Sequence, residues 1–387
     1  MRPLDGVRIL DLTRLLPGPF GSLVLRDLGA QVDKIEDAGA GDYLRYMQPQ
    51  KAGTSVAFAA LNRGKRSAVV NFKHAEGRAA FERLVGSYDV LFEQFRPGVL
   101  DRLGLGHQVL REHHPSLIIC ALTGYGQDGP LRDRAGHDLN YLARAGILGL
   151  QGPTDRPPQV PGTQLADVSG GLWAALAIVA ALRRRDATGE GDILDIAMTD
   201  GIVGFASIGM TAALAGAPPT RGRDVLTGGL APYQTYFAKD GAPMTLASLE
   251  PKFWMAFAAA TGLDADPTAL LPGDHQDALR DRIAEVFAGR TRSEWEAFAE
   301  EHDCCVEPVL APEEVIDDAQ LAARGVFFEQ ERAGETLTLF RTPVSDRDEH
   351  PPPAPDKGAD TRQVFLDAGF SEDEIAALLE SGAIGQA

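Results

Sequence analysis

Two polar segments of the sequence carry residue types that suit acid–base chemistry: RAGHDLNY at 134–141 and QLADVSGGLW at 164–173. His137 and Asp167 stand 30 residues apart in these segments, and each is expected at the edge of a loop. An imidazole and a carboxylate can each take up and return a proton, so the pair could work on a single carbon. The pattern also fits a histidine that only packs in a loop and an aspartate that only caps a helix.

A glycine pair, Gly170 and Gly171, follows Asp167 and opens the apolar segment GLWAALAIVAALRRRD. The order of these residues predicts that Asp167 lies beside a helix N-terminus, where backbone N–H groups lack partners. We therefore expect amides at Gly170 and Gly171 to stabilise an oxyanion on a bound carbonyl. The segment is apolar almost all round, which indicates a buried helix, and its apolar stretch at 172–182 is too short to span a bilayer.

Six short runs rich in β-branched or apolar residues must position these groups. They are VRILDLT at 7–13, QVDKI at 31–35, SAVVNF at 67–72, YDVLFEQ at 88–94, SLIICALT at 116–123 and ILDIAM at 193–198. Segments with helical spacing lie between several of them, and this alternation predicts a Rossmann-like, doubly wound parallel sheet of about six strands in an α/β fold. The turn after the first run, RLLPGPFGS, lacks the GxGxxG spacing, which disfavours a nicotinamide dehydrogenase.

The rest of the chain predicts a second, smaller domain. We expect residues 1–200 and 328–387 to form the large domain, 201–227 a linker, and 228–327 a small α+β domain. Ser371 and Glu374 are spaced as a capping box, so a C-terminal helix should begin there.

The net charge of the chain and its distribution limit the classes of ligand that the protein could bind. The 387 residues carry a net charge of −18, which disfavours binding to nucleic acid or to an anionic membrane. The negative charge lies in the C-terminal part: residues 1–249 hold 26 basic and 25 acidic residues, and residues 250–387 hold 11 and 30. Between Asn62 and Gly104 there are eight basic and five acidic residues, a surplus that suits a phosphate-bearing ligand. A solvated face of mixed charge is the alternative for any one of these arginines.

Three cysteines and eight histidines do not suggest a disulfide framework or a metal centre. Two of the cysteines, Cys304 and Cys305, are adjacent, and no histidines show HxxxH or HExxH spacing. We expect a cytoplasmic protein without a metal.

Motifs along nearly the whole chain resemble those of the α-methylacyl-CoA racemases, within the family III CoA-transferase superfamily. They include LDGVRILDLTRLLPGP, LNRGKRS, EQFRPGVLDRLGLG, LTGYGQDGP, AGHDLNYLA, LADVSGG, GGLAPYQTY and ASLEPKFW. RPGV, LTGYG and LAD are similar to the superfamily as a whole, whereas AGHDLNY and SLEPKF are more specific to racemases.

The resemblance implies the superfamily's fold, an interlocked homodimer and a two-base racemisation of 2-methylacyl-CoA thioesters by His137 and Asp167. By similarity, Glu250 hydrogen-bonds the histidine, and Asp138 is a weaker candidate for orienting it. No cofactor is implied beyond the CoA of the substrate. The residues implied to contact CoA are Asn62, Arg63, Lys65, Arg66, Arg96, Arg102, Gly136, Asn140 and Tyr141.

Two other functions stay open on the sequence. A CoA-transferase would use Asp167 as a nucleophile and form an aspartyl-CoA thioester. A CoA-binding protein without catalysis would have the same fold, because a fold does not fix its chemistry.

Overall fold

The computed structural model describes residues 2–386, which form two compact units. The first comprises the chain up to Leu142, Thr163–Gly204, and the chain from Ala319 onward. The second comprises Ala143–Gly162 and Phe205–Asp318. Residues 201–227, predicted to be a linker, contain the helix α9 (Ser207–Leu214), and most of them belong to the second unit.

The first unit is built on a seven-stranded sheet with the order β14-β5-β2-β1-β6-β7-β8. Its strands are β1 (Arg8–Asp11), β2 (Gln31–Glu36), β5 (Arg66–Val70), β6 (Val90–Glu93), β7 (Ile118–Thr123), β8 (Asp192–Ala197) and β14 (Ile384–Gly385). The first six are the predicted runs, and they pair in parallel. In chain order they run 3-2-1-4-5-6, so the Rossmann-like prediction is confirmed. The short β14 pairs antiparallel with β5 at one edge.

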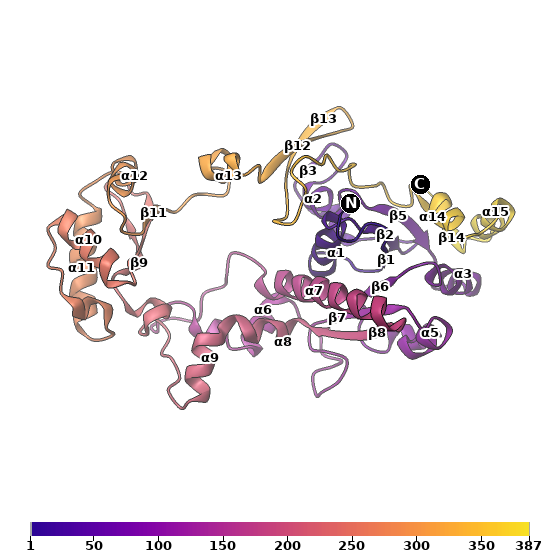
Figure 1. Cartoon of the computed structure of the whole chain (residues 1–387), viewed down its shortest axis with the longest axis horizontal. Helices are drawn as coiled ribbons and strands as arrows, with labels where there is room; N and C mark the ends of the chain where they lie inside the picture. The colour runs from indigo at the N-terminus through magenta and orange to yellow at the C-terminus, as the bar shows by residue number, and fades with distance from the viewer. Residues whose placement is uncertain (1, 387) are drawn as a thin grey trace. The chain divides into compact units, whose positions relative to one another are not determined.

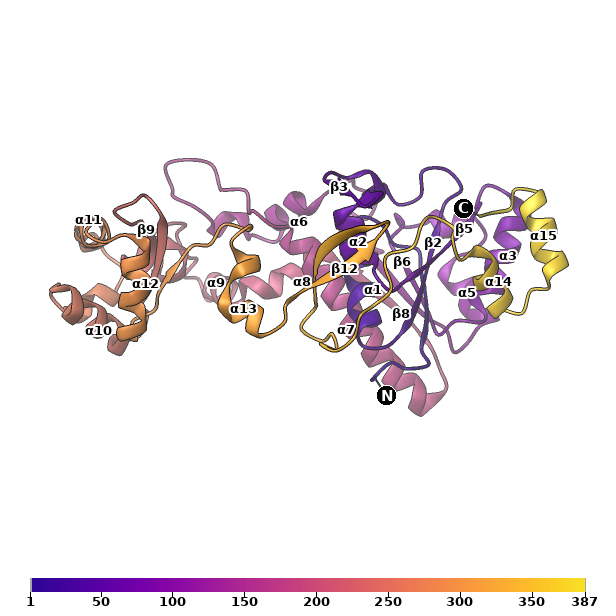
Figure 2. The ribbon, with the colours of Figure 1, turned by 90° about the horizontal axis from the view of Figure 1, so that it is seen from above.

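Helices cover both faces of this sheet (Figure 2). One face is packed by α1 (Pro17–Asp27) and α7 (Leu165–Thr188), and the other by helices that share one apolar core. These are α3 (Ala75–Val85), α5 (His107–His113), α14 (Thr361–Asp367) and α15 (Glu372–Glu380). The predicted capping box at Ser371 and Glu374 starts α15. Figure 1 shows α14 and α15, in yellow, beside the edge of the sheet that holds β5 and β14.

The long helix α7 is a core element. By length and apolar composition it is the one helix among residues 2–386 that could cross a membrane, but half of its apolar window is buried. It packs against α1, β7 and β8 and ends at Thr188. The next residue, Gly189, caps it with a φ of 77°, the left-handed conformation that glycine adopts easily.

Gly171 lets α1 and α7 approach closely. A Cβ on Gly171 would lie 2.3 Å from the carbonyl oxygen of Pro17 and 3.1 Å from the backbone nitrogen of Gly21. Alanine normally favours a helix by about 1 kcal/mol over glycine, but this overlap with rigid backbone costs about 1–3 kcal/mol. We expect Gly171→Ala to lower the free energy of unfolding measured in urea. Gly209→Ala in α9 is the control, because its nearest neighbour is the flexible end of Leu150. An unchanged or raised stability for Gly171→Ala would contradict this close packing.

Smaller elements complete the first unit. They are α2 (Val56–Asn62), α4 (Val99–Arg102), α6 (Asp138–Arg144), α8 (Met198–Val203), α13 (Ala319–Ala323), and the hairpins β3 (Gln50–Lys51) with β4 (Thr54–Ser55) and β12 (Phe327–Arg332) with β13 (Glu335–Phe340). The α6 helix begins in the first unit, and its last residues belong to the second.

The second unit has a three-stranded antiparallel sheet in the order β11-β10-β9. Its strands are β9 (Tyr233–Phe237), β10 (Pro243–Ala247) and β11 (Val306–Pro308), and its larger helices are α10 (Pro251–Thr261), α11 (His275–Phe287) and α12 (Arg292–Glu301). Trp254, Phe257, Phe287 and Trp295 fill its core with nearly complete burial. The unit therefore has the α+β character that the alternating pattern after residue 228 predicts.

Candidate active site

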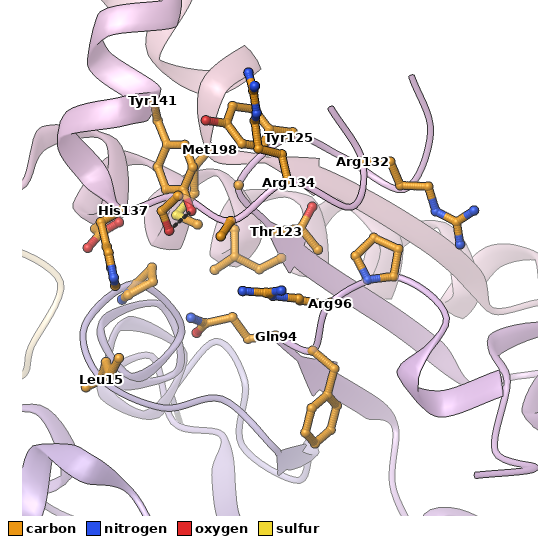
Figure 3. Close-up of a pocket in the computed structure, with 18 of the residues that line it drawn as sticks. Leu15, Gln94, Arg96, Thr123, Tyr125, Arg132, Arg134, His137, Tyr141 and Met198 are labelled. Carbon is orange, nitrogen blue, oxygen red and sulfur yellow. Dashed lines mark hydrogen bonds between the residues drawn. The ribbon is translucent and has the colours of Figure 1, made fainter. Parts of the chain in front are cut away.

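A cavity of about 190 Å³ lies at the carboxyl ends of the central strands of the first unit. Three loops line it, one after β1, one after β6 and one after β7. The strand order reverses between β1 and β6, and in open α/β sheets this is where ligands bind. The residues that line it include Arg14, Leu15, Pro17, Gln94, Arg96, Thr123, Tyr125, Arg132, Arg134, His137, Tyr141, Asp167 and Met198 (Figure 3).

His137 reaches this cavity from the loop just before α6 (Figure 3). Its backbone is held on both sides: its N–H donates to Oδ1 of Asn140 at 3.1 Å, and its carbonyl accepts from the N–H of Asn140 at 2.8 Å. The hydroxyl of Tyr141 donates to the carbonyl of Gly136 at 2.6 Å. Within residues 2–386 the imidazole makes no hydrogen bond, so the side chain is free to contact a substrate.

Asp167 enters the same cavity as the third residue of α7. Its carboxylate is half-buried and has no hydrogen-bond partner in the described part of the chain. Burial, and after it the negative charge of Asp138, raises the pKa of Asp167 to about 7. A carboxyl with such a pKa can be an acid or a base near neutral pH.

The raised pKa predicts that Asp167 destabilises the fold at high pH. An unfolded aspartate has a pKa of about 3.9, so the stabilising contribution linked to this carboxyl is full below about pH 4 and is lost as the pH rises through about 7. The full shift corresponds to about 4 kcal/mol, and solvent screening of the half-buried group reduces this to about 2 kcal/mol. We expect Asp167→Asn to unfold at higher urea than the wild type at about pH 8. The two proteins should be alike below about pH 4, and equal stability at both pH values would contradict the prediction.

Asp138 holds the start of α7. Its Oδ1 accepts hydrogen bonds from the backbone N–H groups of Ala166, at 2.7 Å, and Asp167, at 3.1 Å. The structure therefore places this carboxylate at the start of the helix that carries Asp167. Among the described residues, no hydrogen bond joins the side chains of Asp138 and His137. The structure therefore gives no support to the predicted role of Asp138 in orienting His137.

The predicted oxyanion site at Gly170 and Gly171 conflicts with the structure. The helix starts at Leu165, so both glycines lie in its second turn, where amide N–H groups bond to carbonyls one turn earlier. Both residues are buried, and Gly171 contacts the backbone of α1. Their small size serves helix packing, and neither offers an unpaired amide to a ligand.

Residues 4–361 match the family model described as CoA-transferase family III. The chain belongs to CoA-transferase family III. It is 35% identical over 383 residues to the α-methylacyl-CoA racemase of Homo sapiens, covering 96% of this chain and 95% of that protein. It is also 31% identical over 401 residues to a succinyl-CoA:glutarate CoA-transferase of Mus musculus, covering 100% and 91%. A crystal structure of a CaiB/BaiF family protein from Brucella suis superposes with a TM-score of 0.81 at 31% identity, covering 95% and 99%.

Membership in CoA-transferase family III makes the cationic residues near the cavity candidates for contacts with CoA. Of those implied by resemblance, Arg96, Gly136 and Tyr141 line the cavity. Arg102 is exposed at the end of α4, and Asn140 is exposed at the start of α6. Their contacts with CoA stay predictions.

The basic side chains of the NRGKRS motif bond to carboxylates of the protein itself, which conflicts with the prediction that they bind phosphate. Arg63 is buried, and its guanidinium forms two hydrogen bonds with Asp27. Lys65 is also buried: its ammonium contacts Asp11, Ser22 and Asn62, and burial lowers its pKa to about 8. The side chain of Asn62 is buried beside it.

Arg66 pairs with carboxylates on two elements. It forms hydrogen bonds to both oxygens of Asp33 and an ion pair with Asp367 at 2.6 Å. Since these partners already balance its charge, Arg66 ties α14 to the sheet.

Glu250 belongs to the second unit, at the residue before α10. Its carboxylate is exposed and pairs with the ammonium of Lys252 at 3.3 Å. Its predicted hydrogen bond to His137 stays a prediction.

Sequence reasoning missed six basic or polar residues that line the cavity: Arg14, Gln94, Thr123, Tyr125, Arg132 and Arg134. Gln94 directly follows β6, and Arg14 comes three residues after the end of β1. That position near the strand ends is the signal that could have found them. Arg132 and Arg134 lie in the loop before His137. Among residues 2–386, no group of three His, Cys, Asp or Glu side chains is placed to hold a metal ion.

Proposed function

We propose that this enzyme of CoA-transferase family III racemises 2-methylacyl-CoA thioesters by two-base 1,1-proton transfer. The observation that carries the proposal is that His137 and Asp167 line one cavity and that neither side chain has a hydrogen-bond partner within the described residues. A racemisation without redox chemistry needs two such groups, one for each face of the carbon. The resemblance to racemases at 35% identity supports the same reaction.

The chain's residues would act in the following order. In one direction, the Asp167 carboxylate takes the α-proton, and the electron pair of the broken C–H bond moves into the thioester carbonyl to give an enolate. The protonated imidazole of His137 then gives a proton to the opposite face, and the reverse direction exchanges the two roles. Arg14, Arg96, Arg132 and Arg134 around the cavity supply positive charge that favours the enolate.

The proposed reaction uses no cofactor beyond the CoA carried by the substrate. We also propose that the enzyme is a cytoplasmic homodimer and that Glu250 tunes His137, as the family resemblance implies. Glu250→Gln should then lower kcat for racemisation, and an unchanged rate would remove Glu250 from the proposal.

Isotope exchange tests the reaction. A single enantiomer of a 2-methylacyl-CoA is incubated with the enzyme in heavy water, and the product is followed by mass spectrometry and chiral analysis. We expect one deuterium at the α-carbon together with loss of optical purity. If neither occurs at substrate concentrations that saturate CoA binding, the racemase proposal is wrong.

A CoA-transferase reaction is the second candidate, favoured by the 31% identity to a succinyl-CoA:glutarate CoA-transferase and by the unpartnered carboxylate of Asp167. Here Asp167 would attack the thioester carbonyl, forming a mixed anhydride and expelling CoA as a thiolate. The thiolate would then attack the aspartyl carbonyl, releasing the donor carboxylic acid and leaving CoA as an aspartyl thioester. This reaction needs a second carboxylic acid and leaves the α-proton in place. A borohydride- or hydroxylamine-trapped adduct at Asp167, with no deuterium uptake, would establish it. Binding of CoA with neither activity would instead indicate a binding protein without catalysis.

A further inference from the structure

Asp138 connects the two helices that present the candidate bases. It is the first residue of α6, directly after His137, and its Oδ1 accepts the N–H groups of Ala166 and Asp167 in the first turn of α7. At the start of a helix these N–H groups have no partners inside the helix. Asp138 therefore supplies, from a position 28 residues earlier in the chain, the cap that fixes where α7 begins.

The arrangement puts two carboxylates close together, but in different surroundings. Asp138 accepts two backbone N–H groups, and such donors stabilise a negative charge. Asp167 accepts none within the described residues, and Asp138 is the one charged group that contributes to raising its pKa. When two carboxylates share a region, the charge of the first favours the protonated form of the second.

Other groups near Asp167 are cationic or neutral. Besides Asp167, the titratable and charged side chains around the cavity are Arg14, Arg96, Tyr125, Arg132, Arg134, His137 and Tyr141. At the close approach of α1 to α7, Pro17 and Gly21 contact Gly171, and α8 contributes Met198 to the cavity wall. Because the cations would favour an ionised Asp167, they are opposed by burial of the carboxyl and, after it, by the like charge of Asp138.

We propose that Asp138 is a positioning residue for Asp167: its backbone bonds fix the start of α7, and its negative charge favours the protonated form of the Asp167 carboxyl. This inference rests on the proposed function, because a base that must also return a proton has to exist in both forms at the working pH. It assigns Asp138 to the carboxylate base and not to the histidine.

Asp138→Asn tests the charge and keeps the hydrogen-bond acceptor. The pH dependence of deuterium exchange is measured for this variant and for the wild type. We expect the midpoint assigned to Asp167 to fall by about one pH unit, since a like charge is removed. Asp128→Asn, an exposed acid in the neighbouring loop, is the matched control and should leave the midpoint unchanged. An unchanged midpoint for Asp138→Asn would overturn the proposal.

A second readout does not depend on racemisation. Carbodiimide with an amine labels protonated carboxyls, and the labelling of the Asp167 peptide across pH is read by mass spectrometry, with exposed Asp133 as the internal reference. The labelling midpoint of Asp167 should fall in Asp138→Asn even if the wild type proves to be a transferase. If the wild type shows no α-proton exchange but the labelling midpoint of Asp167 still falls in Asp138→Asn, only the proposed function is refuted. If neither midpoint moves, the inference about Asp138 is wrong.

Asp138→Ser is the second variant, used if the asparagine variant fails to fold. Serine is neutral, and its hydroxyl oxygen can accept a hydrogen bond from a backbone N–H. The variant should show the same lowered midpoint. A folded Asp138→Ser protein with the wild-type midpoint would also contradict the proposal.

Discussion

Replacement of His137 by alanine is expected to lower racemisation by about 10²–10⁴-fold while sparing α-proton exchange for one enantiomer. The two bases would face opposite sides of the α-carbon, so each removes the proton of one enantiomer. With the imidazole gone, Asp167 still takes the proton from the enantiomer that presents it to the carboxylate. The proton or deuteron then returns to the same face, and the configuration is kept.

Asp167→Ala should show the complementary result, with exchange spared for the other enantiomer. Exchange is followed separately for each pure enantiomer by mass spectrometry in heavy water, and configuration by chiral chromatography. His113→Ala is the control for loss of an imidazole, because His113 is exposed on α5 and pairs with Glu82 away from the cavity. If both active-site variants spare the same enantiomer, the two groups act on one face, and the inversion mechanism fails.

The parallel sheet could be predicted from the sequence because its central strands are buried on both faces. Such strands read as nearly continuous apolar runs, as in SLIICALT, where all six residues of β7 are buried. The prediction of a linker at 201–227 did not anticipate a helix there. The small residues of SIGMTAAL form one, and none of its side chains is buried within the unit. A loose apolar pattern without a buried face resembles a linker.

The start of α7 shows where local patterns are insufficient. Gly170 and Gly171 look like a helix start, yet the helix begins five residues before Gly170. Its cap is Asp138, which lies far from it in sequence, and no local spacing could reveal that partner. The predicted oxyanion site required α7 to begin at these glycines. Because the helix begins earlier, that prediction is wrong.

The same argument applies to the basic motif NRGKRS. A local surplus of positive charge suits a phosphate, but it equally suits buried carboxylates contributed by other elements. Asp11 comes from β1, Asp27 from α1 and Asp33 from β2, and these three acids bind Lys65, Arg63 and Arg66. Only the fold brings them together.

The pair of Arg63 and Asp27 is expected to be essential for stability. Nη1 and Nη2 of Arg63 lie 2.6 and 2.8 Å from the two carboxylate oxygens of Asp27, and their side chains are 1% and 0% exposed. Thr342 and Ser345 also donate to Asp27, so the pair fastens the segment after β13 to α1. Arg63→Met leaves Asp27 with only its longer ion pair to Arg26, at 3.3 Å, and Asp27→Leu leaves the guanidinium of Arg63 without a carboxylate, so each change should cost about 3–5 kcal/mol in urea unfolding.

The double variant separates structure from ligand binding at this pair. Arg63→Met with Asp27→Leu removes both charges and should cost clearly less than the sum of the single changes, because no unpaired charge remains. The KM for acyl-CoA should stay near the wild-type value in the folded double variant. Arg96→Met should do the reverse and raise KM with little change in stability, because Arg96 lines the cavity. A double variant that is stable but binds acyl-CoA poorly would return Arg63 to the CoA site, where its sequence motif first suggested it.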